Sequence, residues 1–180
     1  MWYPCGMRIY LLEPYFSGSH RQWAEGLQMH SRHEIHLVTH EGRFWKWRLG
    51  GGFVTIAAEL EEEIAAHGPA DLLLATSMLD LAGMLGVARQ AVGGVPAALY
   101  FHENQLTYPS VGRTRAEAAL GMANWASVVA ADGVAFNSEF HRTAFFEALP
   151  GFLRAYPDRR HDHLIPAARR RSAVVPVGVD

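Results

Sequence analysis

Cysteine is nearly missing from this sequence of 180 residues, and long hydrophobic runs are missing altogether. Cys5 is the only cysteine, so no disulfide can form within the chain, and we expect a reducing, cytoplasmic location. No apolar run approaches the length of a membrane-spanning helix, and the opening residues lack the basic start and long apolar stretch of a signal peptide. We therefore expect no membrane partner, and we interpret residues 1–6 as an extension before the domain.

Net charge is also small, at -2, which excludes a general attraction to nucleic acid or to an anionic membrane. A partner of either kind would have to be bound by a local basic patch. The content of 49% hydrophobic and 19% charged residues is typical of a folded globular chain, and the length suits one domain with a single core.

Several catalytic and binding motifs are absent. There is no G-x-G-x-x-G dinucleotide fingerprint, no G-x-x-x-x-G-K-[ST] phosphate loop and no G-x-S-x-G nucleophile elbow. Two of the ten histidines, His161 and His163, stand in a loose basic segment, but no cysteine pair or His-Glu-x-x-His spacing accompanies them. We therefore expect no metal ion and no other cofactor.

Short apolar runs alternate with segments of helical character along the chain. The expected strands are 7–13, 35–39, 70–77, 95–101, 133–136 and 173–177. The expected helices are 20–31, a segment from Phe53 that stops at His67, 79–91, 115–130 and 139–149. Apolar strands that alternate with helices predict a parallel sheet covered on both faces. The fold class is therefore α/β, a doubly wound, mostly parallel, Rossmann-like domain over residues 7–180.

Three segments between these elements have distinctive compositions. We interpret Pro14 as the end of the first strand, and the triple glycine 50–52 as a flexible joint inside a loop. Residues 150–172 have a looser, arginine-rich pattern in which we expect no regular element.

Polar residues follow four of the predicted strands at the point where each strand ends. These candidate substrate-binding and catalytic residues are Ser17, Gly18, Ser19 and His20, then Thr76 and Ser77, then His102, Glu103, Asn104 and Gln105, then Asn137 and Ser138. In open parallel sheets, ligands bind beyond the carboxyl ends of the strands. The sequence therefore predicts a binding site at that edge of the sheet.

The run YFHENQLTYP, residues 100–109, is the most unusual of these segments, because a buried strand leads directly into a histidine, a carboxylate and two amides. His102 is a candidate for bonding a sugar hydroxyl or a phosphate, or for general base catalysis. Glu103 is a candidate for accepting hydroxyl hydrogen bonds or for orienting His102. The alternative is an interior histidine followed by a helix-terminus carboxylate. The backbone amides of residues 17–19 suit an anion at a helix start, and the alternative there is a plain helix cap by Ser19.

Residues 43–48 interleave three cations with three aromatic side chains on a predicted loop. Such a patch stacks bases or sugars and contacts phosphates, although packed aromatics with solvated cations fit the pattern equally well. The candidate RNA contacts are Arg43, Trp45, Lys46, Trp47 and Arg48, with Arg159 and Arg160 from the later basic segment.

Six segments together resemble a known family. They are LEPYFSGSHRQW (12–23), WKWR (45–48), ATSMLDL (75–81), FHENQLTYP (101–109), FNSEF (136–140), and FLR (152–154) followed by Pro157-Asp158. They are similar to the amino-terminal half of the tRNA-queuosine mannosyltransferases, glycosyltransferase-like proteins related to family 4 of the retaining GT-B enzymes. The likeness extends through nearly the whole chain from Met7.

The resemblance implies two Rossmann-like domains across a cleft, with GDP-mannose as donor and queuosine in the anticodon of tRNA for aspartate as acceptor. It implies no metal and no enzymic nucleophile. On this sequence, Gly18 and Ser19 would approach the donor diphosphate and His102 the transferred sugar. Glu103 and Asn104 would shape the sugar or diol pocket, and Asn137 and Ser138 would line the same crevice.

Two departures from the family pattern bear on activity. The first loop has Ser17-Gly18 where the resemblance implies a glycine pair, which narrows the room for close backbone approach. The chain also ends at Asp180, where the carboxyl-terminal nucleotide-sugar domain is expected, so we predict weak donor binding and no turnover from these residues alone. The alternatives are a GT-B enzyme with a lipid or small-molecule acceptor, a non-catalytic Rossmann-like binding module, and a hydrolase using His102 and Glu103.

Overall fold

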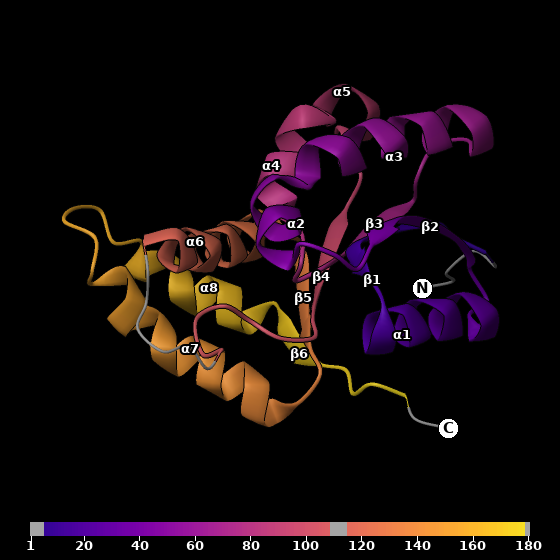
Figure 1. Cartoon of the computed structure of the whole chain (residues 1–180). Helices are drawn as coiled ribbons and strands as arrows, with labels where there is room; N and C mark the ends of the chain where they lie inside the picture. The colour runs from indigo at the N-terminus through magenta and orange to yellow at the C-terminus, as the bar shows by residue number, and fades with distance from the viewer. Residues whose placement is uncertain (1–5, 109–114, 179–180) are drawn as a thin grey trace.

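The computed structural model describes residues 6–108 and 115–178 (Figure 1). Its strands are β1 (Arg8–Phe16), β2 (Glu34–Glu41), β3 (Leu72–Thr76), β4 (Ala97–Phe101), β5 (Gly133–Phe136) and β6 (Ser172–Val174). They form one parallel sheet in the order β2-β1-β3-β4-β5-β6. The predicted α/β, Rossmann-like fold is therefore confirmed.

The helices connect these strands as crossovers. They are α1 (Gly18–His30), α2 (Trp45–Gly51), α3 (Phe53–His67), α4 (Leu81–Val87), α5 (Arg89–Val92), α6 (Arg115–Ala130), α7 (Glu139–Leu153), η1 (Asp162–Leu164) and α8 (Ile165–Arg170). Among the helices of the described segments, none is both long enough and apolar enough to cross a membrane.

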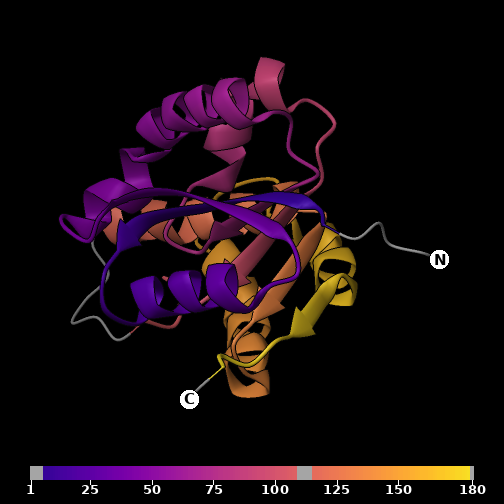
Figure 2. The ribbon, with the colours of Figure 1, turned by 90° about the vertical axis from the view of Figure 1, so that its right-hand side faces the viewer.

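The two faces of the sheet have different coverings, because alternate residues of a strand point to opposite faces. Ile9 and Leu11 of β1 pack with Ala24 of α1 in a small cluster. The larger core lies on the other face, where α3, α4, α6 and α7 pack against residues such as Leu99 and Phe136. Figure 1 shows α1 on one side of the strands and α3 on the other, and the view turned by 90° in Figure 2 shows the same separation.

The aromatic segment before the triple glycine is a helix, α2, rather than the predicted loop. Leu49 is fully buried, and this anchoring outweighs the poor helix propensity of the glycines. Gly52 has helical φ and ψ and its N–H donates to the carbonyls of Trp47 and Arg48, so α2 runs almost directly into α3. A Cβ at Gly52 would lie 2.5 Å from the Arg48 carbonyl oxygen, so glycine here permits a tight junction instead of forming a flexible joint.

Two prolines lie inside elements that they were expected to end or follow. β1 continues through Pro14 to Phe16, and its pairing with β2 shifts register between Glu13 and Phe16, which accommodates the missing N–H. α7 continues through Pro150 to Leu153, four residues beyond the predicted end. The arginine-rich segment contains α8, where no regular element was predicted. Residues 1–5 of the expected extension and Pro109 lie outside the described residues.

Candidate functional site

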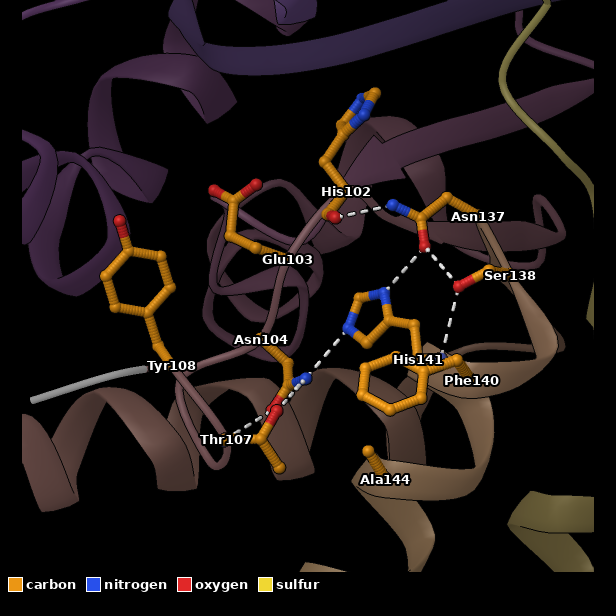
Figure 3. A pocket seen from close by; sticks show the side chains of 10 residues that line it. All are labelled: His102, Glu103, Asn104, Thr107, Tyr108, Asn137, Ser138, Phe140, His141 and Ala144. Carbon is orange, nitrogen blue, oxygen red and sulfur yellow. Dashed lines mark hydrogen bonds between the residues drawn. The ribbon is translucent and has the colours of Figure 1, made fainter.

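The carboxyl edge of the sheet carries a cleft of about 300 Å³ between the loop after β4 and the start of α7 (Figure 3). Its walls are formed by His102, Glu103, Asn104, Thr107, Tyr108, Asn137, Ser138, Phe140, His141 and Ala144. Five of the predicted site residues therefore line one cleft, namely His102, Glu103, Asn104, Asn137 and Ser138. Their roles remain predictions.

A row of three charged side chains, Glu13, His20 and Glu103, connects this cleft to β1 and α1. Glu13, in the carboxyl half of β1, is fully buried, and its Oε2 accepts a hydrogen bond of 2.8 Å from His20 Nδ1. The other ring nitrogen, His20 Nε2, lies 3.3 Å from Glu103 Oε2. The Glu103 side chain is 31% exposed, so this row of charged side chains is buried at Glu13 and reaches the cleft at Glu103.

His20 is a cation and its neighbour His102 is not. Burial acts to lower the pKa of His20, but hydrogen bonds to Glu103 and Glu13 outweigh it and raise that pKa to about 10. Burial lowers the pKa of His102 to about 3, and the charge on His20 adds to this effect. The two ring centroids are only 4.3 Å apart, so protonating both would place like charges in contact. At neutral pH the pair of rings therefore carries one positive charge, on His20.

The ring of His102 lies among aromatic rings rather than free in the cleft. Its centroid is 4.7 Å from that of Trp23 and 4.8 Å from that of Tyr100. Its Nε2 atom is buried and has no hydrogen-bond partner among the described residues. Leaving a buried polar atom unpaired costs about 1–3 kcal/mol, so this nitrogen marks a place where a bound ligand or water would be stabilised.

Three side chains beside His102 form a rigid polar wall. The Asn104 amide nitrogen donates to His141 Nε2 at 2.7 Å, and His141 Nδ1 pairs with the Asn137 amide oxygen at 2.9 Å. This pattern is that of a neutral imidazole with its proton on Nδ1. Burial lowers the pKa of His141, in agreement with that state. The Asn137 amide nitrogen also donates to the backbone carbonyl of His102, as Figure 3 shows, so the wall fixes the loop after β4.

The loop before α1 presents two exposed residues, Gly18 and Ser19, at the helix start. Gly18 has φ of 51°, a left-handed conformation that favours glycine. Ser17 is the N-cap in place of Ser19, and its side chain makes no capping hydrogen bond. Unpaired amides at a helix start are suited to an anion, so this loop remains a candidate for a phosphate.

Seven of the predicted site residues do not line the cleft: besides Ser17, Gly18, Ser19 and His20 at the start of α1, these are Thr76, Ser77 and Gln105. Thr76 and Ser77 are buried, and their hydroxyl oxygens have no partner among the described residues. The Gln105 backbone N–H donates to the side-chain oxygen of Asn124. The side-chain nitrogen of Asn124 in turn donates to the backbone carbonyl of Ser77. These residues connect the loops after β3 and β4, and the structure gives them no contact with the cleft.

Sequence reasoning missed Glu13, Trp23, Tyr108, Phe140 and His141, all of which contribute to the cleft or to the charge behind it. Glu13 carried the clearest signal, because it is a carboxylate that closes the apolar run MRIYLLE. His141 follows the N-cap Ser138 by three residues, and its contacts with Asn104, Asn137 and Phe101 distinguish it from a surface residue of α7.

Glu13, His20 and His102 each offer one possible metal ligand atom, and these atoms lie within 4.8 Å of one another. Both ring nitrogens of His20 face carboxylates, and its pKa of about 10 keeps the ring protonated at neutral pH. A metal ion binds the unprotonated nitrogen, so it would have to displace this proton. The donor set therefore fits a proton better than a metal, and the absence of a metal requirement stays a prediction.

The candidate RNA contacts fall on separate elements. Trp47 is 66% exposed on α2, while Trp45 is half-buried near Tyr108. Lys46 is paired with Glu117 at 3.3 Å. Of the remaining cations, Arg43 is exposed beside Glu41, Arg48 is half-buried against His40, and Arg159 and Arg160 are exposed in the segment after α7. Only part of the aromatic patch is therefore free to stack on a partner.

Residues 8–179 match a protein family described as "tRNA-queuosine alpha-mannosyltransferase N-terminal". The chain is also similar to a tRNA-queuosine alpha-mannosyltransferase of Drosophila melanogaster, with 30% identity over 171 residues. This alignment covers 93% of the chain and 43% of the fly protein, so the chain spans less than half the length of that relative.

Proposed function

The chain belongs to the tRNA-queuosine alpha-mannosyltransferase family, and on that premise we propose that it is the acceptor-side domain of a retaining mannosyltransferase. The donor is GDP-mannose, and the acceptor is queuosine in the anticodon of tRNA(Asp). The second domain of the GT-B arrangement binds the nucleotide part of GDP-mannose. The chain alone binds the donor weakly and does not turn over.

One observation carries this proposal beyond the family likeness. Glu103 stands at the mouth of the cleft, and the cation His20 lies 3.3 Å from one of its carboxylate oxygens. An anionic carboxylate with a free oxygen accepts hydrogen bonds from vicinal hydroxyls, which both a hexose and a cyclopentene-diol present. Charge-assisted bonds of this kind orient a neutral polyol, and orientation is what a reaction without an enzymic nucleophile needs.

The other cleft residues take complementary roles in this proposal. His102 contacts the transferred sugar from the wall of the cleft. Asn104 and Asn137 hold the wall of the cleft through His141, and Ser138 adds a hydroxyl at its rim. Gly18 and Ser19, at the start of α1, approach the donor diphosphate.

The tRNA lies across the exposed part of the aromatic and basic surface. Trp47 offers an open ring for stacking, and Arg43 and Lys46 on the same segment offer exposed charge. Tyr108 connects this surface to the cleft, because it is 53% exposed, lines the cleft and has its ring centroid 6.4 Å from that of Trp45. A base delivered to the cleft would pass these rings.

The test is product analysis with the complete gene product. The protein is incubated with GDP-mannose and queuosine-bearing tRNA, the tRNA is digested, and the nucleosides are weighed by mass spectrometry. Queuosine that gains one hexose supports donor, acceptor and reaction together. Control reactions omit the donor, or supply tRNA that carries guanosine in place of queuosine.

Two other results would change the proposal in different ways. Consumption of GDP-mannose without hexose on queuosine would refute the acceptor and point to a lipid or small molecule. A folded protein that neither binds nor consumes GDP-mannose would refute the transferase role of the complete protein and favour a binding module. The 180-residue chain tested alone should give no product.

A further inference from the structure

A second group of histidines and carboxylates lies at the opposite, amino edge of the sheet. It consists of His36 on β2 with Glu63 and His67 on α3, and we call it the His36 cluster. β2 is the edge strand of the sheet, and α3 runs over it, as Figure 1 shows. None of these residues lines the cleft at the carboxyl edge.

The three side chains converge on one point. Glu63 Oε2 lies 3.8 Å from His36 Nδ1 and 3.4 Å from His67 Nε2. All three ligand atoms are within 4.8 Å of one another. Metal–ligand distances of about 2.0–2.2 Å in a tetrahedral zinc site place neighbouring ligand atoms roughly 3.4 Å apart. Small side-chain rotations would therefore bring the cluster to that geometry.

Both nitrogens of the His36 ring lie near carboxylates. His36 Nε2 pairs with Glu34 Oε1 at 2.8 Å, and Arg8 holds the other carboxylate oxygen of Glu34 at 3.1 Å. His36 Nδ1 faces the Glu63 carboxylate, so this nitrogen is placed to serve as a metal ligand. A carboxylate on the outer nitrogen of a ligating histidine is the usual arrangement around protein-bound metals.

A buried tyrosine holds the two elements of the cluster in place. The Tyr10 ring stacks on the His36 ring with centroids 5.0 Å apart. Its hydroxyl donates to the backbone carbonyls of Gly68 and Glu63 at the end of α3, at 2.8 Å and 3.3 Å. The position of His36 relative to the end of α3 is thus fixed before any ligand binds, which lowers the entropic cost of binding.

We propose that His36, Glu63 and His67 bind a divalent transition-metal ion such as Zn²⁺, with Glu34 as an outer carboxylate that orients His36. Two imidazoles and one carboxylate suit Zn²⁺ or Co²⁺ rather than Mg²⁺ or Ca²⁺, which prefer oxygen ligands. The side chains of Glu63 and His67 are 40% and 48% exposed, so a water molecule completes the coordination. The ion joins the edge strand to α3 and takes no part in sugar transfer.

The test is a Co²⁺ titration of the complete gene product, purified without a histidine tag and followed by visible absorption. The expected result is one ion per chain with a tetrahedral absorption band, displaced by Zn²⁺. His67→Asn and Glu63→Gln should each weaken binding at least tenfold. The matched control is His30→Asn, an exposed histidine in the last turn of α1, which should bind as the wild type does.

Glu34→Gln gives a sharper reading, because it changes no ligand atom. Loss of an outer carboxylate typically weakens binding by about 10–100-fold, and Glu34→Gln should fall in that range. Circular dichroism of each variant without metal checks that the fold is retained. The proposal is overturned if the wild type binds the ion with a dissociation constant weaker than micromolar. It is also overturned if Glu63→Gln and His67→Asn bind the ion as tightly as the wild type.

Discussion

The same two side-chain types build different sites at the two edges of this sheet. In the carboxyl-edge group, one buried ring, His20, has a carboxylate on each nitrogen, and Glu13 is fully buried. In the His36 cluster, Glu63 stands between the mostly buried His36 ring and the half-exposed His67 ring, and Glu34 pairs with the other nitrogen of His36. His20 has carboxylates at 2.8 Å and 3.3 Å on its two nitrogens and lies in the interior, whereas His36 Nδ1 lies 3.8 Å from Glu63, beside a second ring, His67, that is 48% exposed. The distances and the burial, not the residue types, separate the two groups.

The largest expected difference between the two groups is in stability. Glu13→Gln leaves His20 with one carboxylate in a buried place, and it should lower the free energy of unfolding by about 3 kcal/mol. Glu63→Gln, the matched change at the exposed edge, should cost less than about 0.5 kcal/mol without metal. Urea denaturation of the two variants measures both values. Equal losses would remove the distinction between the edges.

Loss of the His102 ring should affect transfer more than folding. His102→Ala in the complete gene product should lower kcat/KM for queuosine-bearing tRNA on the order of 10²-fold, because a positioned polar group is lost from the cleft. The variant should still unfold cooperatively in urea. His67→Ala, at the other edge, should keep the wild-type rate. A His102→Ala enzyme with the wild-type rate would return this ring to a purely structural role.

The pH dependence of stability should have two limbs that belong to neighbouring rings. The pKa of His20, about 10 in the folded chain, lies above its ordinary value of 6.5. Its contribution is therefore full below about pH 6.5 and is lost as the pH rises towards 10. The pKa of His102, about 3, lies below 6.5. Its contribution is present above about pH 6.5 and is lost as the pH falls towards 3. Each limb has a slope of up to about 1.4 kcal/mol per pH unit.

Two variants separate these limbs. His20→Gln should flatten the alkaline limb of the unfolding free energy, and His102→Gln should flatten the acid limb. The measurement is a series of urea titrations between pH 4 and pH 9.5. Limbs that persist unchanged in both variants would show that other groups carry the pH dependence.

The smallest expected effect lies on the exposed aromatic and basic surface beside the cleft. Trp47→Ala should weaken tRNA binding roughly fivefold to tenfold, which corresponds to the loss of about one stacked base. Met29→Ala on α1 is the control, because Met29 is also a large exposed side chain, at 76%. Filter binding at two salt concentrations measures both. Equal affinity of the two variants would remove Trp47 from the proposed RNA surface.

The sequence was sufficient for the sheet and for most crossovers. The bounds of β5 were predicted to the residue and those of α6 closely, since each is a continuous apolar or alanine-rich segment. Helix α2 was missed because its glycines and aromatics indicate a loop locally, and its helical state depends on burial of Leu49 in the tertiary core. Pro14 misled in the same way, because a register shift with β2 lets the strand continue through it.

The site could be predicted only as far as position along strands allows. The rule that ligands bind at the carboxyl edge selected His102 and Asn137, which do line one cleft. The rule predicts at which edge of the sheet a site lies, but not whether a residue at that edge is buried. It therefore selected the buried Thr76 as well. It also missed Glu13, whose importance depends on the distance to His20 rather than on spacing in the sequence.

The most direct measurement compares hexose transfer to queuosine by two variants of the complete gene product, one from each edge of the sheet. Glu103→Gln keeps the shape of the cleft but removes the carboxylate charge beside His20. His67→Asn changes the opposite edge. We predict hexose on queuosine at the wild-type rate with His67→Asn, and a rate lower on the order of 10²-fold with Glu103→Gln. Equal rates from wild type and Glu103→Gln would contradict the assignment of transfer to this cleft.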